Sequence, residues 1–294
     1  MLNTHSGEYA ALGVSACWTV SALFFEKAGA KMGSSLSVNI VRLFLAIIFL
    51  GITTLFTRGM FFPADASADN WFWLAISGVV GFYLGDLCLF KSYSVIGSRT
   101  AALIMSLAPM LTAIIGWFFL KEQLSFQSIL AIVVCISGII MAIANRKMKL
   151  NIPLKGFLLA FGGALGQAVG LILSKKGMSD YDPIAATQIR AIFGFLSFAV
   201  MITAMGRWGK IKQAMADKAG MTSVTIGTIF GPFIGVSLSL FAIQHTQTGI
   251  ASTLMALVPV LIIWPSAVMF KEKIKIQQVI GAIISIAGVS LFFL

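Results

Sequence analysis

The chain has 294 residues, of which 59% are hydrophobic and only 11% are charged. Soluble globular domains carry about 25% charged residues, so this composition excludes a water-soluble fold and indicates a protein embedded in a lipid bilayer. Lys and Arg outnumber Asp and Glu by 21 to 10, a formal net charge of +11. No polar stretch combines basic with aromatic residues, so we assign the excess to loops beside anionic lipid and expect no nucleic-acid partner.

Ten apolar segments follow one another along the chain, each close to the roughly 20 residues that a membrane-spanning helix requires. The polar breaks between them, such as 145–153 and 207–218, are too short for an extramembrane domain. The sequence therefore predicts an all-α integral membrane protein with ten transmembrane helices. The predicted spans are 9–25, 36–57, 71–91, 97–119, 126–144, 154–173, 184–205, 222–243, 249–270 and 276–294.

The second half of the sequence repeats the first. Pro109 and Glu122 recur 150 residues later as Pro259 and Glu272. Further pairs are Gly85 and Gly235, Met105 and Met255, and Gly138 and Gly288 at the same offset, and Lys27 and Lys175, and Arg42 and Arg190, at an offset of 148. Because each copy holds five spans, an odd number, the copies must have opposite orientations. We predict two inverted five-helix repeats, 1–148 and 149–294, in one membrane unit, an arrangement typical of secondary transporters.

The two Pro…Glu segments carry a family likeness. SVIGSRTAALIMSLAPMLTAIIGWFFLKEQLSFQSILAIVVCISGI and QHTQTGIASTLMALVPVLIIWPSAVMFKEKIKIQQVIGAIISIAGV resemble the tandem repeats of EamA-type transporters, which belong to the drug/metabolite transporter superfamily. The resemblance covers nearly the whole chain. It implies ten helices around a central cavity, alternating access, and export or exchange of amino acids, other metabolites or toxic compounds. Substrate would bind near mid-membrane, with the fifth and tenth helices at the periphery.

Two arguments give opposite orientations of the chain. Fifteen Lys and Arg residues follow the odd-numbered predicted spans, and only four follow the even-numbered ones. The positive-inside rule then predicts a cytoplasmic location for the crowded side and termini outside. The resemblance implies the reverse, with both termini in the cytoplasm.

Asp86 is the only carboxylate deep within a predicted span. A charge inside the bilayer costs roughly 2.5 to 3.5 kcal/mol on insertion scales, so its presence requires a reason. One hypothesis is a cavity-facing carboxylate that binds substrate or couples transport to protons, with Tyr83 one turn back. The other is a structural salt bridge to Lys91 or Arg99. The repeat-equivalent residue is Val236.

Arg42 and Arg190 are repeat equivalents near the starts of the second and seventh spans. Their guanidinium groups could bind an anionic or zwitterionic ligand bidentately. Alternatively, they reach the interface or cap neighbouring helix ends.

Four repeated residues near the ends of spans suggest structural roles. Pro109 and Pro259 remove a backbone hydrogen bond and predict kinks in the fourth and ninth spans, which could hinge a gate. Glu122 and Glu272 lie in the turns that follow, where each carboxylate would face the N-terminus of the next helix.

Polar and polarisable side chains at predicted cavity positions complete the candidate substrate site. Gln167 lies among glycines that permit close helix approach, so interhelical hydrogen bonding is an equal alternative for it. Methionines could line an adaptable cavity wall or simply pack. These candidates are Trp18, Gln167, Gln188, Gln244, Met105 and Met255.

The sequence has no P-loop, metalloprotease or nucleophile-elbow motif, so we expect no enzyme activity, cofactor or metal. The leading prediction is a secondary transporter of a small polar or amphipathic metabolite in a bacterial inner membrane. A homo-oligomer is compatible with this prediction. The alternatives are a non-transporting scaffold or sensor, and a membrane-embedded enzyme.

Overall fold

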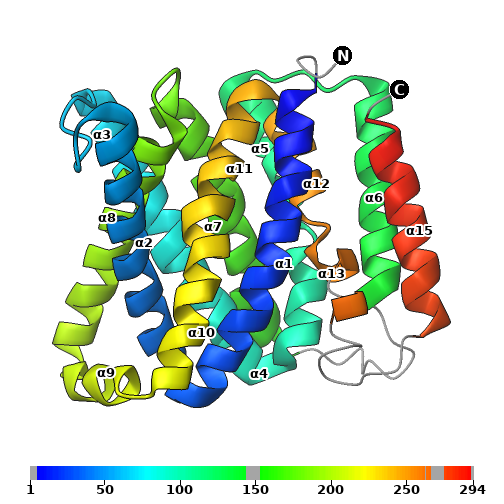
Figure 1. Cartoon of the computed structure of the whole chain (residues 1–294). Coiled ribbons are helices and arrows are strands. Elements are labelled where there is room, and N and C mark those ends of the chain that lie inside the picture. The colour runs from blue at the N-terminus through cyan, green and yellow to red at the C-terminus, as the bar shows by residue number, and fades with distance from the viewer. Residues whose placement is uncertain (1–4, 144–152, 262, 266–274, 293–294) are drawn as a thin grey trace.

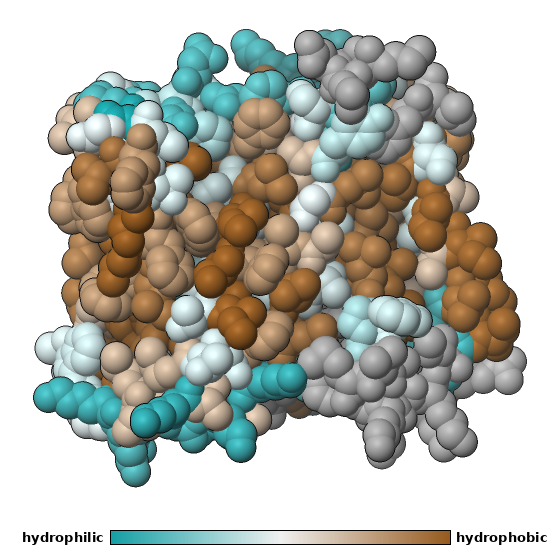
Figure 2. All heavy atoms as spheres, in the orientation of Figure 1, coloured by the Kyte–Doolittle hydropathy of each residue, from teal (hydrophilic) through white to brown (hydrophobic). Residues whose placement is uncertain are grey.

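The computed structural model describes residues 5–143, 153–261, 263–265 and 275–292, and every element assigned among them is a helix (Figure 1). Seven helical segments are long and apolar enough to cross a membrane, and three further apolar helices are shorter. Figure 2 shows a hydrophobic band around the middle of the bundle and hydrophilic residues at both ends. The protein is therefore a multi-pass membrane protein, and the prediction of an all-α membrane fold is confirmed.

The helices divide into two similar series. The first contains α1 (Ser6–Met32), α2 (Ser35–Arg58), α3 (Ala68–Gly78), η1 (Val79–Gly85), α4 (Asp86–Met105), α5 (Ala108–Leu120) and α6 (Phe126–Ile143). The second contains α7 (Leu154–Met178), α8 (Pro183–Ala204), α9 (Trp208–Met215), α10 (Lys218–Thr228), η2 (Ile229–Phe233), α11 (Ile234–His245), α12 (Thr248–Met255), α13 (Val258–Leu261) and α15 (Ile276–Ser290). The two-turn helix α9 lies within the predicted polar break 207–218.

Local residues set the ends of these helices. α1 and α2 each stop at a glycine in the left-handed conformation, Gly33 at φ 63° and Gly59 at φ 75°, which residues with a Cβ adopt at a cost. α8 begins where Asp182 accepts a 2.8 Å hydrogen bond from Ala185 N. These short connections make successive helices antiparallel.

A π-helical segment interrupts the third apolar segment of each half. η1 begins at Val79 and η2 begins at Ile229, which is the repeat-equivalent residue at the 150 offset. π-helices widen the backbone locally and occur most often at functional sites. Neither segment was predicted from the sequence, because no composition rule marks them.

The first long helix of each half packs against the third segment of the other half. α1 lies along α10, η2 and α11, and α7 lies along α3, η1 and α4. A serine joins each interface: Ser21 Oγ donates to Gly227 O at 2.8 Å, and Ser77 Oγ donates to Gly170 O at 2.6 Å. Gly227 is the repeat equivalent of Ser77, so the halves interlock in the same way.

α4 reverses direction within its length. A Cβ added to Gly163 would lie 3.2 Å from Leu89 Cβ and 3.3 Å from Met105 Sδ, so those two residues are neighbours in space. Sixteen residues of straight helix span about 24 Å. The chain therefore turns back at the polar segment 91–97. This reversal coincides with the boundary between the predicted spans 71–91 and 97–119, although helical backbone is assigned throughout α4.

The fourth apolar segment of each half is broken rather than kinked. A two-residue turn separates α4 from α5, and another separates α12 from α13. Pro109 and Pro259 each occupy the second position of the helix after the turn, where a backbone N–H has no intrahelical partner. The predicted kinks in the fourth and ninth spans thus take the form of a turn just before each proline, and residues 262 and 266–270 of the ninth span lie outside the described residues.

Basic residues gather at the end of the bundle that contains α9, as the alternating loops predict. We call this the α9 end, and we call the opposite end, where α1 begins and α2 ends, the Glu122 end. Figure 2 shows hydrophilic residues at both ends. The described Lys and Arg residues on α9, its flanks and the last turns of α1 are Lys27, Lys31, Arg207, Lys210, Lys212 and Lys218.

α6 and α15 form a tightly packed pair at one edge of the bundle (Figure 1). A Cβ on Gly281 would lie 2.6 Å from Gly138 O and 2.8 Å from Ala142 Cα, distances that atoms do not tolerate. Helices in lipid lack a hydrophobic force between them, so close backbone approach supplies the attraction.

We therefore expect Gly281→Ala to lower the free energy of unfolding by about 1–3 kcal/mol, because the added methyl forces the two helices apart. The matched control is Gly29→Ala, since a Cβ on Gly29 meets nothing within 4 Å. This control should be as stable as the parent or slightly more stable. Thermal unfolding in one detergent compares the two, and equal loss in both variants would contradict the expectation.

Candidate functional site

Charged side chains from both halves meet at η1, inside the bundle. Arg42 of α2 forms an ion pair with Asp86, the first residue of α4, through Nη2 and Oδ2. The two side chains are only 13% and 23% exposed. Arg42 is therefore a partner of Asp86 that the sequence did not predict, and the side chain of Arg99, one of the two predicted partners, lies outside the described residues. In a low-dielectric interior, removing either partner leaves an uncompensated charge.

Arg190 of α8 reaches the same place from the other half. The residue is only 5% exposed, and its guanidinium carbon lies 4.9 Å from the centroid of the Phe82 ring in η1. Arg190 Nη2 is 3.3 Å from the position that a Cβ on Gly81 would occupy, so the lack of a side chain at Gly81 makes room for the guanidinium. Asp86 lies within electrostatic range of Arg190.

Glycines hold α7 against η1. A Cβ on Gly166 would lie 2.8 Å from Gly85 Cα, so no larger residue fits there. Gln167 follows at once and is exposed, although its neighbours on the same helix face, Gly163, Leu171 and Ser174, are buried. An exposed polar residue thus lies next to the contact between α7 and η1.

A second polar cluster closes the Glu122 end, and we call it the terminal lock. Lys175 Nζ, in the last turn of α7, donates to Glu122 Oε1 at 2.7 Å and to Thr246 O at 2.8 Å. Glu122 Oε2 accepts from Thr248 N at 2.9 Å and from Thr248 Oγ1 at 2.7 Å. Thr246 Oγ1 in turn donates to Glu8 Oε1 at 2.8 Å. The lock joins α1, α7 and two turns between helices.

The backbone of the α5–α6 turn places Glu122 in the lock. Lys121 ends α5 in the left-handed conformation, with φ 55°, and turns the chain back over the helix. Glu122 Oε2 then lies 3.1 Å from the position of a Cβ on Gly116. The carboxylate caps the N-terminus of α12, whereas the sequence predicted that it would face the helix following its own turn.

A pocket of about 510 Å³ opens beside the terminal lock. Its walls are mostly polar and come from the turns after α5 and α11, from α1 and from α7. The lining residues are Glu8, Glu122, Gln123, Ser125, Ser128, Lys175, Gln244, His245, Thr246, Gln247 and Ile250.

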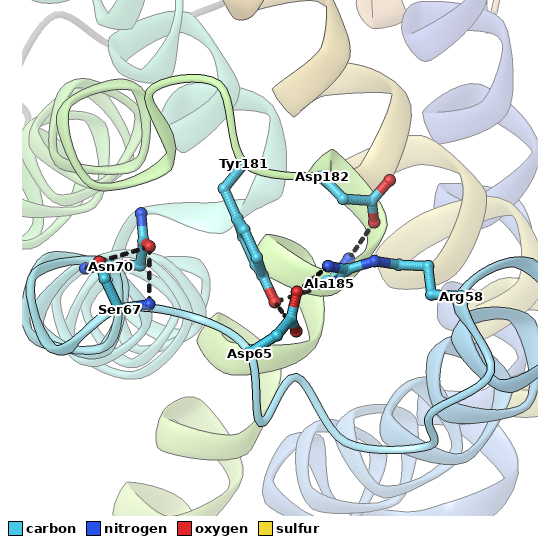
Figure 3. Close-up of polar contacts among 7 residues, drawn as sticks. All are labelled: Arg58, Asp65, Ser67, Asn70, Tyr181, Asp182 and Ala185. Carbon is cyan, nitrogen blue, oxygen red and sulfur yellow. Dashed lines mark hydrogen bonds and ion pairs between the residues drawn. The ribbon is translucent and has the colours of Figure 1, made fainter.

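The connections at the same end are tied to each other (Figure 3). Arg58 Nη1 donates to Tyr181 Oη at 3.0 Å, Tyr181 Oη donates to Asp65 Oδ1 at 2.9 Å, and Arg58 also forms an ion pair with Asp65. Burial raises the pKa of the Tyr181 phenol above its usual value, so the group stays protonated as a donor. The loop before α3 is thereby fixed to the α7–α8 connection of the other half.

The sequence profile of the EamA-like transporter family matches this chain twice, over residues 5–144 and 154–294. The chain belongs to the EamA-like transporter family. It is therefore a transporter and not an enzyme, and the predicted resemblance is confirmed.

Individual relatives of this EamA-like protein either have low sequence identity to it or match only part of it. The uncharacterized transporter YetK of Bacillus subtilis (strain 168) is 22% identical over 258 residues, covering 86% of this chain and 76% of YetK. The threonine/homoserine exporter RhtA of Escherichia coli (strain K12) is 32% identical over 129 residues, covering 42% of this chain and 40% of RhtA. A solved crystal structure matches with a TM-score of 0.75 at 14% identity, covering 98% of this chain and 96% of that one, which shows a shared fold.

Several sequence-predicted residues of this EamA-like transporter surround the Arg42–Asp86 pair or its repeat-equivalent position. The Tyr83 ring packs edge-on against Phe198, with 5.2 Å between centroids. Trp18 of α1 lies against η2 and α11: its Cδ1 and Nε1 are each 2.7 Å from the position of a Cβ on Gly235. Met105 lies next to Gly163 of α7.

Three other candidates lie away from this group. Gln188 is fully buried and its Nε2 donates to Phe61 O at 2.9 Å, which holds the loop after α2. Gln244 Nε2 donates to Ser179 O at 2.9 Å, at the Glu122 end. Met255 is 2% exposed and packs in the core. Glu272 lies outside the described residues, and no metal-binding cluster of His, Cys, Asp or Glu occurs within them.

Sequence reasoning missed the full membership of the terminal lock. The prediction treated Glu122 and Lys175 separately, and it gave no role to Thr248. A signal was available, because Lys175 is one of only four Lys or Arg residues assigned to its side of the membrane. A half-buried cation in a region with so few other cations needs an anionic partner.

We expect Glu122 and Lys175 to show a coupling free energy of about 1–2 kcal/mol in a double-mutant cycle with Glu122→Gln and Lys175→Met. The pair is shielded from water, with side chains 12% and 25% exposed, so it should be stronger than a surface ion pair. Equilibrium unfolding in mixed micelles measures the cycle.

The matched control replaces the neighbouring Lys176, whose Nζ lies 3.8 Å from the centroid of the Trp73 ring. Lys176→Met should combine additively with Glu122→Gln. Additivity in both cycles would show that the Glu122–Lys175 ion pair has no coupling free energy.

Proposed function

We propose that this chain is a secondary transporter that moves a small polar or amphipathic metabolite by alternating access. The observation that carries the proposal is the meeting of Arg42 and Asp86 from one half with Arg190 from the other, at a π-helical segment inside the membrane. Intramembrane charges are costly and mark substrate or ion pathways. Because the group draws on both halves, any relative movement of the halves changes its geometry.

The proposed architecture is ten spans in two inverted repeats, 1–148 and 149–294. The seven long apolar segments and the three shorter ones supply that number of spans. The matching π-segments and the reciprocal packing of α1 and α7 on the opposite halves support an inverted repeat. Substrate sites in such folds lie near the bilayer midplane at the repeat interface, where helices are interrupted.

Access alternates as the halves rock about the central group. The terminal lock joins α1 to α7 and to the turns after α5 and α11, so it closes the Glu122 end. Opening this end requires the Lys175–Glu122 contact to separate. The interrupted fourth segments, with turns before Pro109 and Pro259, allow the two parts of each segment to move separately.

The relatives support a candidate substrate class and location. RhtA is named a threonine/homoserine exporter, so an amino acid-like metabolite is the first candidate cargo and export or exchange the first candidate direction. The described relatives are bacterial, which supports the inner membrane of a bacterium.

Asp86 is the proposed proton-coupling residue. It faces Arg42 directly and Arg190 at longer range. Protonation of Asp86 would remove the negative charge that attracts Arg42. The ion pair would then separate and form again within one transport cycle.

Counter-flow in proteoliposomes tests the transport function. Proteoliposomes that contain the full chain are loaded with an unlabelled pool of amino acids and metabolites. Uptake of each labelled compound is then followed with and without a pH gradient. We expect saturable exchange of at least one compound. Folded protein without any exchange would favour a scaffold or sensor.

Asp86→Asn tests the coupling role. We expect gradient-stimulated exchange to fall at least tenfold in this variant, whereas counter-flow without a gradient persists, because the amide still fills the site but does not titrate. Asp180→Asn, at an exposed position, is the matched control and should behave like the parent. An unchanged gradient response in Asp86→Asn would exclude Asp86 as the coupling site.

A further inference from the structure

Arg190 is a buried cation without a hydrogen-bond acceptor. Only 5% of the residue is exposed, and its Nε is buried with no partner. None of its guanidinium N–H groups donates a hydrogen bond to any residue in the described part of the chain. Arginine has five N–H donors, and buried donors are almost always satisfied. The contact with the Phe82 ring stabilises the charge but offers no acceptor oxygen.

The repeat equivalent of Arg190 shows what is missing. Arg42 is also largely buried, and Asp86 supplies its carboxylate. The residue equivalent to Asp86 in the second half is Val236, which is 8% exposed and apolar. The second half therefore provides Arg190 with no carboxylate of its own.

Arg190 lies beside the glycines that join α7 to η1. The position of a Cβ on Gly81 is 3.3 Å from Arg190 Nη2 and 4.0 Å from Gly166 O. Gln167, the next residue after Gly166, is exposed. A ligand that reaches the guanidinium from this side would have to displace the Phe82 ring or the Arg190 side chain.

We propose that Arg190 binds the carboxylate group of the transported substrate, a deduction that rests on the proposed transport function. The planar guanidinium fork matches a carboxylate bidentately. Arg42, Arg190 and Asp86 together carry a net charge of +1, which one carboxylate neutralises and a phosphate dianion would overshoot. The substrate class is therefore a monocarboxylate, with an amino acid as one member. In the loaded state, the substrate carboxylate pairs with Arg190 as Asp86 pairs with Arg42.

Matched acids and esters test this assignment on the purified full chain. Ligand-dependent thermal stabilisation is titrated with the amino acids and with 3-hydroxybutyrate, each paired with its methyl ester, which adds one methyl group and removes the negative charge. We expect stabilisation by at least one acid and a dissociation constant at least tenfold weaker for its ester. Equal binding of acid and ester, or no acid-specific stabilisation at all, would overturn the proposal.

Substitutions then assign the acid preference to Arg190. Arg190→Gln should weaken acid binding at least tenfold and leave ester binding unchanged, whereas Arg190→Lys should keep part of the preference because it keeps the charge. Arg207→Gln, the same change at an exposed position, is the matched control and should bind like the parent. Undiminished acid binding in Arg190→Gln would overturn the assignment. If Arg190→Gln does not fold, the acid-ester comparison of the parent and Arg190→Lys decides.

The outcome is separable from that of the transport proposal. Exchange of compounds that lack a carboxylate, without acid-specific binding, would leave the transporter function standing and overturn the role of Arg190. Acid-specific, Arg190-dependent binding without exchange of any compound would support the carboxylate site and remove the transport function.

Discussion

The close contact between α7 and η1 is the constraint on which the rest of the structure depends. Gly166 meets Gly85, and Gly170 meets Gly81 with 3.0 Å between the position of an added Cβ and Gly81 Cα. Such contact is possible only where side chains are absent, and in lipid it replaces the hydrophobic force that assembles soluble proteins. It holds the π-helical backbone of η1 against α7 and brings helices of the two halves together at that level.

The charges follow from this contact. Because Gly81 leaves space, Arg190 can extend from the second half to the Phe82 ring, close to Asp86 and Arg42 of the first half. A group with two cations and one anion would be unfavourable in an interior without water. Its stability in the folded protein therefore requires either hydration or an anionic partner. At the Glu122 end the arrangement differs, since Lys175 and Glu122 of the terminal lock form an ion pair and are each hydrogen-bonded to a threonine as well.

The sequence was sufficient for those features that depend on composition and repetition. Apolar segment length predicted an all-α membrane protein, and the repeated Pro…Glu pattern indicated the EamA-like family, because both leave a regular imprint on the residues. The pairing of Asp86 with Arg42 could not be predicted, since Lys91 and Arg99 are nearer in sequence and only helix packing decides between them. Likewise, the sequence predicted a kink at each of the two prolines, because proline suits both a bend within a helix and the first turn of a helix. The roles assigned to individual candidate residues stay predictions until binding and transport are measured.

The pairing of Asp86 with Val236 at equivalent positions has an energetic consequence for the proposed inverted repeat. If both repeats had the same sequence, the conformation open to one side and the conformation open to the other would be related by symmetry and equal in free energy. A resting protein would then divide its time evenly between them. Non-identical pairs of residues remove this degeneracy, and a buried charge opposite a valine removes more of it than an exchange of apolar residues would. In the proposed carrier, the side from which the empty protein waits for its cargo would therefore be set by the positions at which the two halves differ, above all the charged ones.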